Sequence, residues 1–433
     1  MHDLAIIGAG WAGFNAALKA KQSGLKVVLV DKSLLGGTCL NLGCIPTKTL
    51  IQSAKVFNLA KKSSDFGINA GAPAVDFIKV QERKDKIIQQ LRSGMQQMLN
   101  GIDYLAAEAR LASACEIRVF GKTLQAKNIL IATGSRPYEL SQFKFDAKKI
   151  LSSNEIISLK EIPASLLIIG GGVIGCEFAS LFSAFGTKVT LAEKMPQLLP
   201  GEDQEIAKKI ETIFKKRGIK VNTATDAGAL NPDDFDCILV CVGRSPQTEG
   251  LGLDELGINL DKGRIVVDDY LKTNISNIYA AGDCTAKIML AHFAAYQGVS
   301  AVFNLAHPDK AEALNSRFIP RCIFTDPEIA AVGLSEAEAL ARGERVDIHR
   351  FDFMASGMAR ILGETEGFSK IISDNKTGVV LGAALIGPRS TELIGILTLA
   401  VARQLNIKDL RETVFAHPTL SESITEALKS HKS

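Results

Sequence analysis

Residues 36–48, Gly-Gly-Thr-Cys-Leu-Asn-Leu-Gly-Cys-Ile-Pro-Thr-Lys, hold two cysteines, Cys39 and Cys44, with four residues between them. An apolar run with helical spacing follows the pair. If the stretch is helical, the two cysteines lie about one and a half turns apart, which is close enough for a disulfide when the first turn is distorted. We expect Gly43 and Pro46 to supply that distortion, because neither favours a regular helical interior.

The chemistry of this cysteine pair follows from its place at the start of a helix. A helix N-terminus lowers the pKa of a thiol, so a disulfide there is easily reduced to a stabilised thiolate. We therefore predict a redox-active pair. The alternatives are a structural disulfide and half of a metal site. No second cysteine pair with metal-like spacing follows, and the intracellular character of the chain disfavours a structural bridge.

A glycine-rich turn opens the chain. A short apolar strand leads into Gly-Ala-Gly-Trp-Ala-Gly (residues 8–13), a helical pattern follows, and a second strand ends in Asp31. This order is the fingerprint of a dinucleotide site. The turn glycines Gly8, Gly10 and Gly13 allow backbone amides to approach a pyrophosphate at the helix N-terminus. We expect Asp31 to accept hydrogen bonds from an adenosine ribose.

A second fingerprint lies in the middle of the chain. An apolar strand precedes Gly-Gly-Gly-Val-Ile-Gly (residues 170–175), and the next strand ends near Glu193. A carboxylate at this place favours a free ribose 2′-hydroxyl and repels a 2′-phosphate, which selects NAD over NADP. The neighbouring Lys194 weakens this inference without reversing it. The chain therefore holds two dinucleotide-binding units, and buried strands that run into residues 133–135, Gly243 and Asp283 accompany them.

Composition describes an ordinary globular protein of 433 residues, with a net charge of +3, 46% hydrophobic residues and 22% charged residues. The near-neutral charge points to no nucleic-acid or membrane partner. The first strand begins at Asp3, so we expect no signal peptide, and the longest apolar run, residues 393–402, is too short to span a bilayer. We expect a cytoplasmic protein. The six other cysteines lie in apolar contexts typical of small buried side chains.

Taken together, these motifs resemble the flavoprotein disulfide reductases over almost the whole chain, and most closely the branch that oxidises dihydrolipoyl groups. The resemblance implies an α/β fold with two Rossmann-like domains, for FAD and NAD, and a C-terminal α+β dimerisation domain. The implied ranges are 1–147 and 265–316 for the FAD-binding and central parts, 148–264 for the NAD-binding domain, and 317–433 for the dimerisation domain.

The resemblance also assigns cofactor contacts. For FAD they are Gly8, Gly10, Gly13, Asp31, Gly37, Thr38, Lys48, Thr133, Gly134, Ser135, Asp283, Met289, Leu290, Ala291 and His292. For NAD they are Gly170, Gly172, Val173, Ile174, Gly175, Glu177, Glu193 and Gly243. Lys48 is expected near the flavin N5, paired with Glu177, and Asp283 beside the ribityl chain. The alternatives are a solvated Lys48, a helix-face Glu177 and a structural His292.

The family pattern places Cys44 against the flavin and Cys39 on the substrate side, with His417 as general base and Glu422 fixing its tautomer. It implies a homodimer in which each His417 reaches the partner's cysteines, a cis peptide bond at His417-Pro418, and a lipoyl-bearing acyltransferase or carrier as partner protein. The alternative for His417 is a residue that merely neighbours a helix cap.

Two departures from the family pattern concern the glycine turn and the NAD domain. Trp11 stands where the family has proline or a small residue, which could perturb FAD packing. Between Glu193 and Gly243 the chain is short, so we expect a truncated antiparallel meander. Three rival functions remain. A glutathione-type reductase would need arginines near Glu193, and a mercuric-type reductase would need a terminal cysteine pair. The third is a non-catalytic flavin-binding component of a multienzyme complex.

Overall fold

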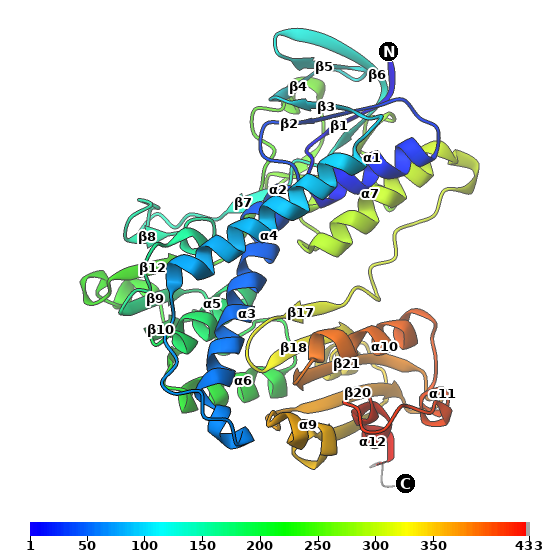
Figure 1. Cartoon of the computed structure of the whole chain (residues 1–433). Helices are drawn as coiled ribbons and strands as arrows, with labels where there is room; N and C mark the ends of the chain where they lie inside the picture. Colours follow the sequence, from blue (N-terminus) through cyan, green and yellow to red (C-terminus); the bar gives the residue numbers. More distant parts are fainter. Residues whose placement is uncertain (430–433) are drawn as a thin grey trace.

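A computed structural model describes residues 1–429 and arranges them around three main sheets (Figure 1). The first sheet lies at the top of the view, the second at the lower left and the third at the lower right, with helices α3 and α4 running between the first two. The helices are α1 Trp11–Gln22, α2 Gly37–Asn41, α3 Cys44–Lys61, α4 Phe77–Met98, α5 Val173–Ala184, α6 Gln204–Lys216, α7 Ala291–Ala306, α8 Glu336–Ala341, α9 Gly357–Leu362, α10 Ser390–Ala402, α11 Ile407–Glu412 and α12 Glu422–Lys429.

The first sheet is the expected Rossmann-like unit of the first glycine fingerprint. Its order is β3-β2-β1-β6-β5-β4, with β16 pairing β6, and its core strands run parallel because α1 and its neighbours cross back over the sheet. Helices α1 and α7 pack closely, since a Cβ at Gly298 would lie 2.2 Å from the Ala12 carbonyl oxygen. The strands are β1 His2–Ile7, β2 Val27–Asp31, β3 Asp103–Ala106, β4 Ala109–Ser113, β5 Glu116–Val119, β6 Lys122–Ile131 and β16 Ile278–Ala280.

The second sheet is parallel throughout, in the order β11-β10-β9-β12-β8, and belongs to the second fingerprint. Its central strands, β9 and β12, are near-continuous apolar runs, as strands buried on both faces require. Between β11 and β12 the chain makes short 3₁₀ turns, so the expected truncation of the meander is confirmed. The strands are β8 Ile150–Leu151, β9 Ser165–Ile169, β10 Lys188–Ala192, β11 Lys220–Asn222 and β12 Cys237–Val240.

The third sheet is antiparallel, in the order β17-β18-β21-β20-β19, and α10 and α12 pack on it. This is the predicted C-terminal α+β unit. Two small ribbons, β7 with β13 and β14 with β15, complete the strands. The remaining strands are β7 Ser135–Pro137, β13 Arg244–Pro246, β14 Leu260–Asp261, β15 Arg264–Ile265, β17 Arg321–Ile323, β18 Glu328–Gly333, β19 Val346–Asp352, β20 Phe368–Asp374 and β21 Val380–Gly387.

The hydrophobic cores do not follow the predicted ranges throughout: residues of α3 such as Leu50 pack in the core of the second sheet, and the segment after β12 packs in that of the first. Leu251, Ile258 and Ile265 share a core with residues of the first sheet such as Ile7 and Ile131, although the range 148–264 assigns most of this segment to the NAD domain. The reason is that the chain returns to the first sheet directly after β12, through the β13–β7 ribbon.

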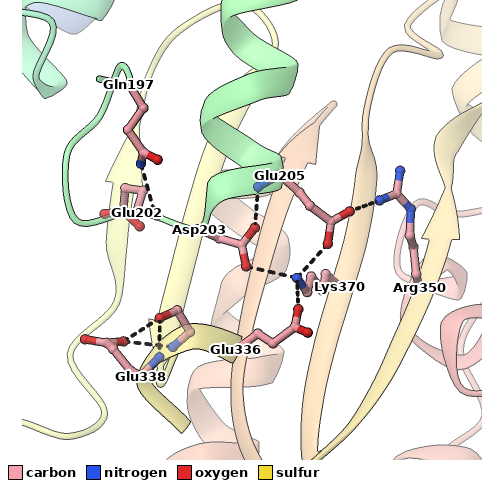
Figure 2. Close-up of polar contacts among 9 residues, drawn as sticks. Gln197, Glu202, Asp203, Glu205, Glu336, Glu338, Arg350 and Lys370 are labelled. Atoms are coloured by element: carbon pink, nitrogen blue, oxygen red, sulfur yellow. Dashed lines mark hydrogen bonds and ion pairs between the residues drawn. The ribbon is translucent and has the colours of Figure 1, made fainter. Parts of the chain in front are cut away.

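A buried lysine ties the second sheet's domain to the third (Figure 2). Lys370 of β20 is 1% exposed, and its Nζ lies 3.0 Å from Asp203, 2.7 Å from Glu205 and 2.6 Å from Glu336. Asp203 and Glu205 lie at the start of α6, and Glu336 begins α8. Arg350 of β19 pairs with Glu205 on its other side.

None of the helices in the described part of the chain is both long and apolar enough to cross a lipid bilayer.

Candidate active site

The two glycine turns have the same geometry. Gly8 and Gly170 both have a φ of +108°, and a Cβ there would lie 2.2 Å from the Ala132 carbonyl oxygen and 2.6 Å from the Cys241 carbonyl oxygen. The turn is therefore accessible to glycine and strained for other residues. At the other end of each turn, a Cβ on Gly13 or Gly175 would collide with the carbonyl oxygen of the first glycine.

Helices α1 and α5 begin at these turns with backbone N–H groups free for a ligand. Their N-cap residues, Gly10 and Gly172, provide no side-chain cap. The first N–H groups of a helix have no partner within it, and a pyrophosphate satisfies them and the helix dipole together. Val173 and Ile174 form the first turn of α5. The residues present therefore fit one dinucleotide at each turn.

The two acids hold the turns in shape. Asp31 accepts hydrogen bonds from the backbone N–H groups of Ala9, at 2.6 Å, and Ser33, at 2.7 Å. Glu193 is 7% exposed and accepts the same pair of bonds, from Gly171 at 2.6 Å and Met195 at 2.7 Å. A carboxylate has about four lone-pair sites, so each can still accept a ribose hydroxyl. The ribose contacts remain predictions.

The cysteines lie on either side of a helix break. Cys39 lies in α2 and Cys44 begins α3, and the chain leaves helical geometry at Leu42 and Gly43, where the Gly43 φ and ψ are −136° and −110°. Our expectation for Gly43 is confirmed, whereas the one for Pro46 is wrong. Pro46 lies in the first turn of α3, where its missing N–H has no helical acceptor to lose, so it starts the helix without distorting it.

The two cysteines are free thiols whose pKa values are shifted in opposite directions by each other. The hydrogen bond from Cys39 lowers the pKa of Cys44 to about 7, against the opposing effect of burial and with help from Lys48. The same hydrogen bond, together with burial, raises the pKa of Cys39 far above its usual value. Cys44 is thus the more acidic thiol of the pair.

Lys48 and Glu177 form the expected pair. The Lys48 Nζ lies 2.8 Å from both carboxylate oxygens of Glu177, whose side chain is 3% exposed. Burial alone would lower the pKa of Lys48, but the charges of Glu177 and Cys44 raise it above its usual value. Phe324 adds two contacts: its backbone N–H donates to Glu177 at 2.9 Å, and its ring centroid lies 4.9 Å from the Lys48 Nζ. The lysine is therefore held charged, one helical turn after Cys44.

A second polar cluster forms where β6 and β16 end. Ser135 donates a 2.5 Å hydrogen bond to Asp283, and Arg244 donates to the Ser135 hydroxyl and carbonyl oxygens at 2.7 and 2.8 Å. Burial lowers the pKa of Arg244, while Asp283 and Cys44 act in the opposite direction, so this guanidinium also lies in the field of the thiols. Thr133 donates to the Gln247 carbonyl oxygen, and Gly134 has a φ of +76°.

The remaining predicted cofactor residues lie at turns and helix starts. A Cβ on Gly37, which begins α2 ahead of Thr38, would lie 2.7 Å from the Gly10 Cα, so the starts of α1 and α2 are in contact. Gly243, with a φ of +135°, joins β12 to β13. Met289 and Leu290 lead into α7, which starts at Ala291. The His292 Nε2 pairs with the Pro320 carbonyl oxygen at 2.9 Å, which is the structural contact that we gave as the alternative to a flavin contact.

His417 and Glu422 pair with each other and lie apart from the cysteines of their own chain. The His417 Nδ1 is 2.8 Å from Glu422, and the His417 side chain is 80% exposed. The Thr419 backbone N–H and His417 hold the pKa of Glu422 below its usual value. The His417-Pro418 peptide is cis, as predicted. Figure 1 shows α12, which starts at Glu422, at the far end of the molecule from α2.

Sequence reasoning missed two residues in this region, Arg244 and Phe324. Arg244 directly follows Gly243, so the end of a buried strand was the available signal for it. Nothing in the sequence indicates that Phe324 meets Glu177, because 146 residues lie between the two and only tertiary packing joins them.

Comparison with known proteins agrees with this geometry. Residues 2–298 match the pyridine nucleotide-disulphide oxidoreductase family, and residues 319–428 match the dimerisation domain of the same family. The chain therefore belongs to the pyridine nucleotide-disulphide oxidoreductases. It is a flavoprotein enzyme with FAD and NAD as cofactors, and its C-terminal domain supports a homodimer.

Curated relatives make the comparison more specific. The chain is 39% identical to a dihydrolipoyl dehydrogenase of Bacillus subtilis, covering 99% of this chain and 98% of the relative, and 40% identical to one of Chlamydia pneumoniae, covering 97% and 95%. Among solved structures, LpdA from Mycobacterium tuberculosis superposes with a TM-score of 0.91 at 28% identity, covering 98% of each chain. The HOCl-induced flavoprotein disulfide reductase RclA from Escherichia coli, crystallised as a Cu(II) complex, gives a TM-score of 0.89 at 30% identity and covers 100% of this chain and 99% of its own.

Proposed function

We propose that this chain is a dihydrolipoyl dehydrogenase, which oxidises a dihydrolipoyl group to its cyclic disulfide and reduces NAD to NADH. The observation that carries the proposal is the pair of free thiols at the break between α2 and α3, in which Cys44 is the more acidic sulfur and lies one helical turn before Lys48. A dithiol–disulfide exchange needs one attackable sulfur and one good leaving thiolate, and this pair supplies both. The dihydrolipoyl dehydrogenases that match the chain over nearly its whole length support the choice of substrate.

The exchange runs in two steps at the cysteines. A substrate thiolate attacks the Cys39 sulfur of the oxidised pair, the Cys39–Cys44 bond breaks, and Cys44 leaves as a thiolate that Lys48 stabilises. The second substrate thiol then loses its proton to His417 of the partner subunit and attacks the sulfur bound to Cys39. The lipoyl ring closes and Cys39 leaves. When bound, FAD would supply the two-electron chemistry that links the thiols to NAD, and the turn of Gly8, Gly10 and Gly13 would hold its pyrophosphate.

His417 suits the role of base in trans. Histidine gains and loses protons near neutral pH, and the Glu422 carboxylate at Nδ1 leaves Nε2 available and stabilises the protonated ring. The side chain is exposed in the single chain and lies in the domain that matches the family's dimerisation model. A dimer would place the imidazole at the partner's cysteines, so that each active site is shared between two chains.

The proposal extends to partner and location. A lipoyl-bearing acyltransferase or carrier protein would deliver the substrate, in the cytoplasm. The shared site requires that the dihydrolipoyl arm enter between the two subunits, because Cys39 belongs to one chain and the base to the other.

A rate comparison tests the function. Dihydrolipoamide with NAD should be turned over, with NADH formation lost in Cys44→Ser, and glutathione disulfide with NADPH should not. Lys408→Met is a matched control, since Lys408 is exposed and lies in α11, away from the cysteines. Faster turnover of glutathione disulfide with NADPH would reject the proposal in favour of a glutathione-type reductase. Absence of turnover in both assays, with FAD bound, would favour a non-catalytic flavin-binding component.

A further inference from the structure

The two cysteines of the redox pair lie on helices that different hydrophobic cores hold in place. Cys39 lies in α2, whose Leu40 is buried in the core of the first sheet. Cys44 begins α3, whose Leu50 is buried in the core of the second sheet. Because the chain leaves helical geometry between the two cysteines, contacts from other elements must fix one sulfur relative to the other.

Helix α4 reaches both cores and packs against both cysteine-bearing helices (Figure 1). Its first residue, Phe77, lies in the core of the second sheet, and Met95 near its end lies in the core of the first. Arg83 joins α4 to α3, because its guanidinium donates to the Thr49 carbonyl oxygen at 3.4 Å. Arg92 joins the other end of α4 to α2. Helix α4 therefore connects the two elements that carry the thiols.

Arg92 binds α2 through Asn41, which lies two residues after Cys39. The Arg92 Nε and Nη2 atoms donate to the Asn41 Oδ1 at 3.1 and 2.6 Å. The Asn41 Nδ2 in turn donates to the carbonyl oxygens of Leu35, at 3.0 Å, and Gly37, at 2.8 Å. A guanidinium can only donate and a carbonyl oxygen can only accept, so one orientation of the amide satisfies both sides. Arg92 thereby fixes which way the Asn41 side chain faces.

Helix α2 depends on such contacts because it is too short to hold itself. It has five residues, fewer than one and a half turns, and isolated helices of that length are not stable in water. Its N-cap residue, Gly36, provides no side-chain cap. Arg92 and Asn41 are both half-buried, so water competes with their hydrogen bonds only in part. The pair therefore holds α2 against α4 at a point close to Cys39.

We propose that Arg92 is a positioning residue for the disulfide exchange, which holds Cys39 near Cys44 through Asn41 and so favours closure of the bond between the two sulfurs. This inference rests on the proposed function, in which the pair opens and closes in each turnover. On closure the S–S bond forms, and the two thiols lose two protons and two electrons, which pass towards NAD. A dithiol whose sulfurs are held together loses less freedom on closure, so it has a more negative reduction potential.

The test is a redox titration of the cysteine pair in the holoenzyme. Protein is equilibrated anaerobically with mixtures of reduced and oxidised dithiothreitol, quenched in denaturant with iodoacetamide, and analysed by mass spectrometry of the peptide that holds Cys39 and Cys44. Arg92→Met removes both hydrogen bonds and should move the midpoint to an about tenfold lower ratio of reduced to oxidised dithiothreitol, or about 30 mV for a two-electron couple. Lys86→Met is the matched control, because Lys86 is an exposed cation on the same helix. Equal midpoints for Arg92→Met and the control would overturn the proposal.

A double-mutant cycle tests whether Arg92 acts through Asn41. In Asn41→Ala the acceptor is gone, so adding Arg92→Met should leave the midpoint where Asn41→Ala alone puts it, and a further shift would overturn the proposal. Arg92→Lys keeps the charge but loses the planar fork, and it should shift the midpoint about threefold. This variant carries the comparison where thermal unfolding shows that Arg92→Met does not fold, and a wild-type midpoint would then overturn the proposal.

The titration needs neither dihydrolipoamide nor NAD, so it separates this inference from the proposed function. A wild-type pair that forms no disulfide at any dithiothreitol ratio would overturn both. A wild-type pair that titrates, together with an Arg92→Met pair that titrates at the same midpoint, would overturn the role of Arg92 alone.

Discussion

Lys370→Met should destabilise the folded chain by about 3 kcal/mol. Removing one partner of a buried ion pair costs about 3–5 kcal/mol, and losing an exposed pair costs about 1 kcal/mol or less. The side chains of Lys370 and Asp203 are both buried, at 1% and 6% exposed. Glu205 and Glu336 are 46% and 38% exposed, so their carboxylates become hydrated when the lysine is lost. Asp203 also keeps a backbone N–H at 2.8 Å, which sets the loss at the low end of the buried range.

The assay is thermal unfolding of the holoenzyme at fixed protein and FAD concentrations. About 3 kcal/mol corresponds to a fall in Tm of roughly 6–12 °C for a cooperative unit of about 150–250 residues. Lys408→Met is the matched control, because that lysine is 77% exposed and pairs with Glu412 at 3.7 Å in the same domain. The control should lower Tm by about 1–2 °C at most. Equal Tm values for the two variants would refute the idea that Lys370 ties the two domains together.

Three further predictions concern the active site. In the reduced holoenzyme, Cys39→Ser should keep the long-wavelength absorption of a thiolate beside a flavin, and Cys44→Ser should lose it. In the wild type this absorption should fade as the pH drops through about 7, because Cys44 is protonated below its pKa. The reverse pattern in the two variants would exchange the roles of the sulfurs. Glu193→Ala should weaken NAD binding and reduce discrimination against NADP in steady-state KM values, whereas a wild type that prefers NADP would contradict this. Cys39→Ser chains refolded together with His417→Gln chains should regain activity at one intact site per heterodimer, and no recovery would show that each site is built from one chain.

The fold and both cofactor turns could be predicted from the sequence because their determinants are local. Each turn needs glycine at fixed places within six residues. Gly8 and Gly170 have a positive φ, and a Cβ at either position would collide with a neighbouring carbonyl oxygen. The cysteine motif is likewise contiguous, so its redox character was predictable. The pairing of His417 with Glu422, five residues later, was implied by the resemblance to the family pattern, and the two side chains do form it.

The missed features depend on packing between distant segments. Lys370 meets carboxylates more than 160 residues away at the start of α6, and Phe324 meets Glu177 from another domain. The role of Pro46 was misjudged because a proline in a first helical turn and a proline within a helix look alike until the helix start is known.

The central claim is that electrons from a dihydrolipoyl group reach NAD through Cys39 and Cys44. An anaerobic half-reaction tests it: oxidised holoenzyme receives one equivalent of dihydrolipoamide and then NAD, and samples are quenched in denaturant with iodoacetamide before peptide mapping. Both cysteines should resist alkylation at the start, become alkylated after the dithiol, and resist again once NADH has formed. NADH formation with no change in the labelling of these two cysteines would contradict the account.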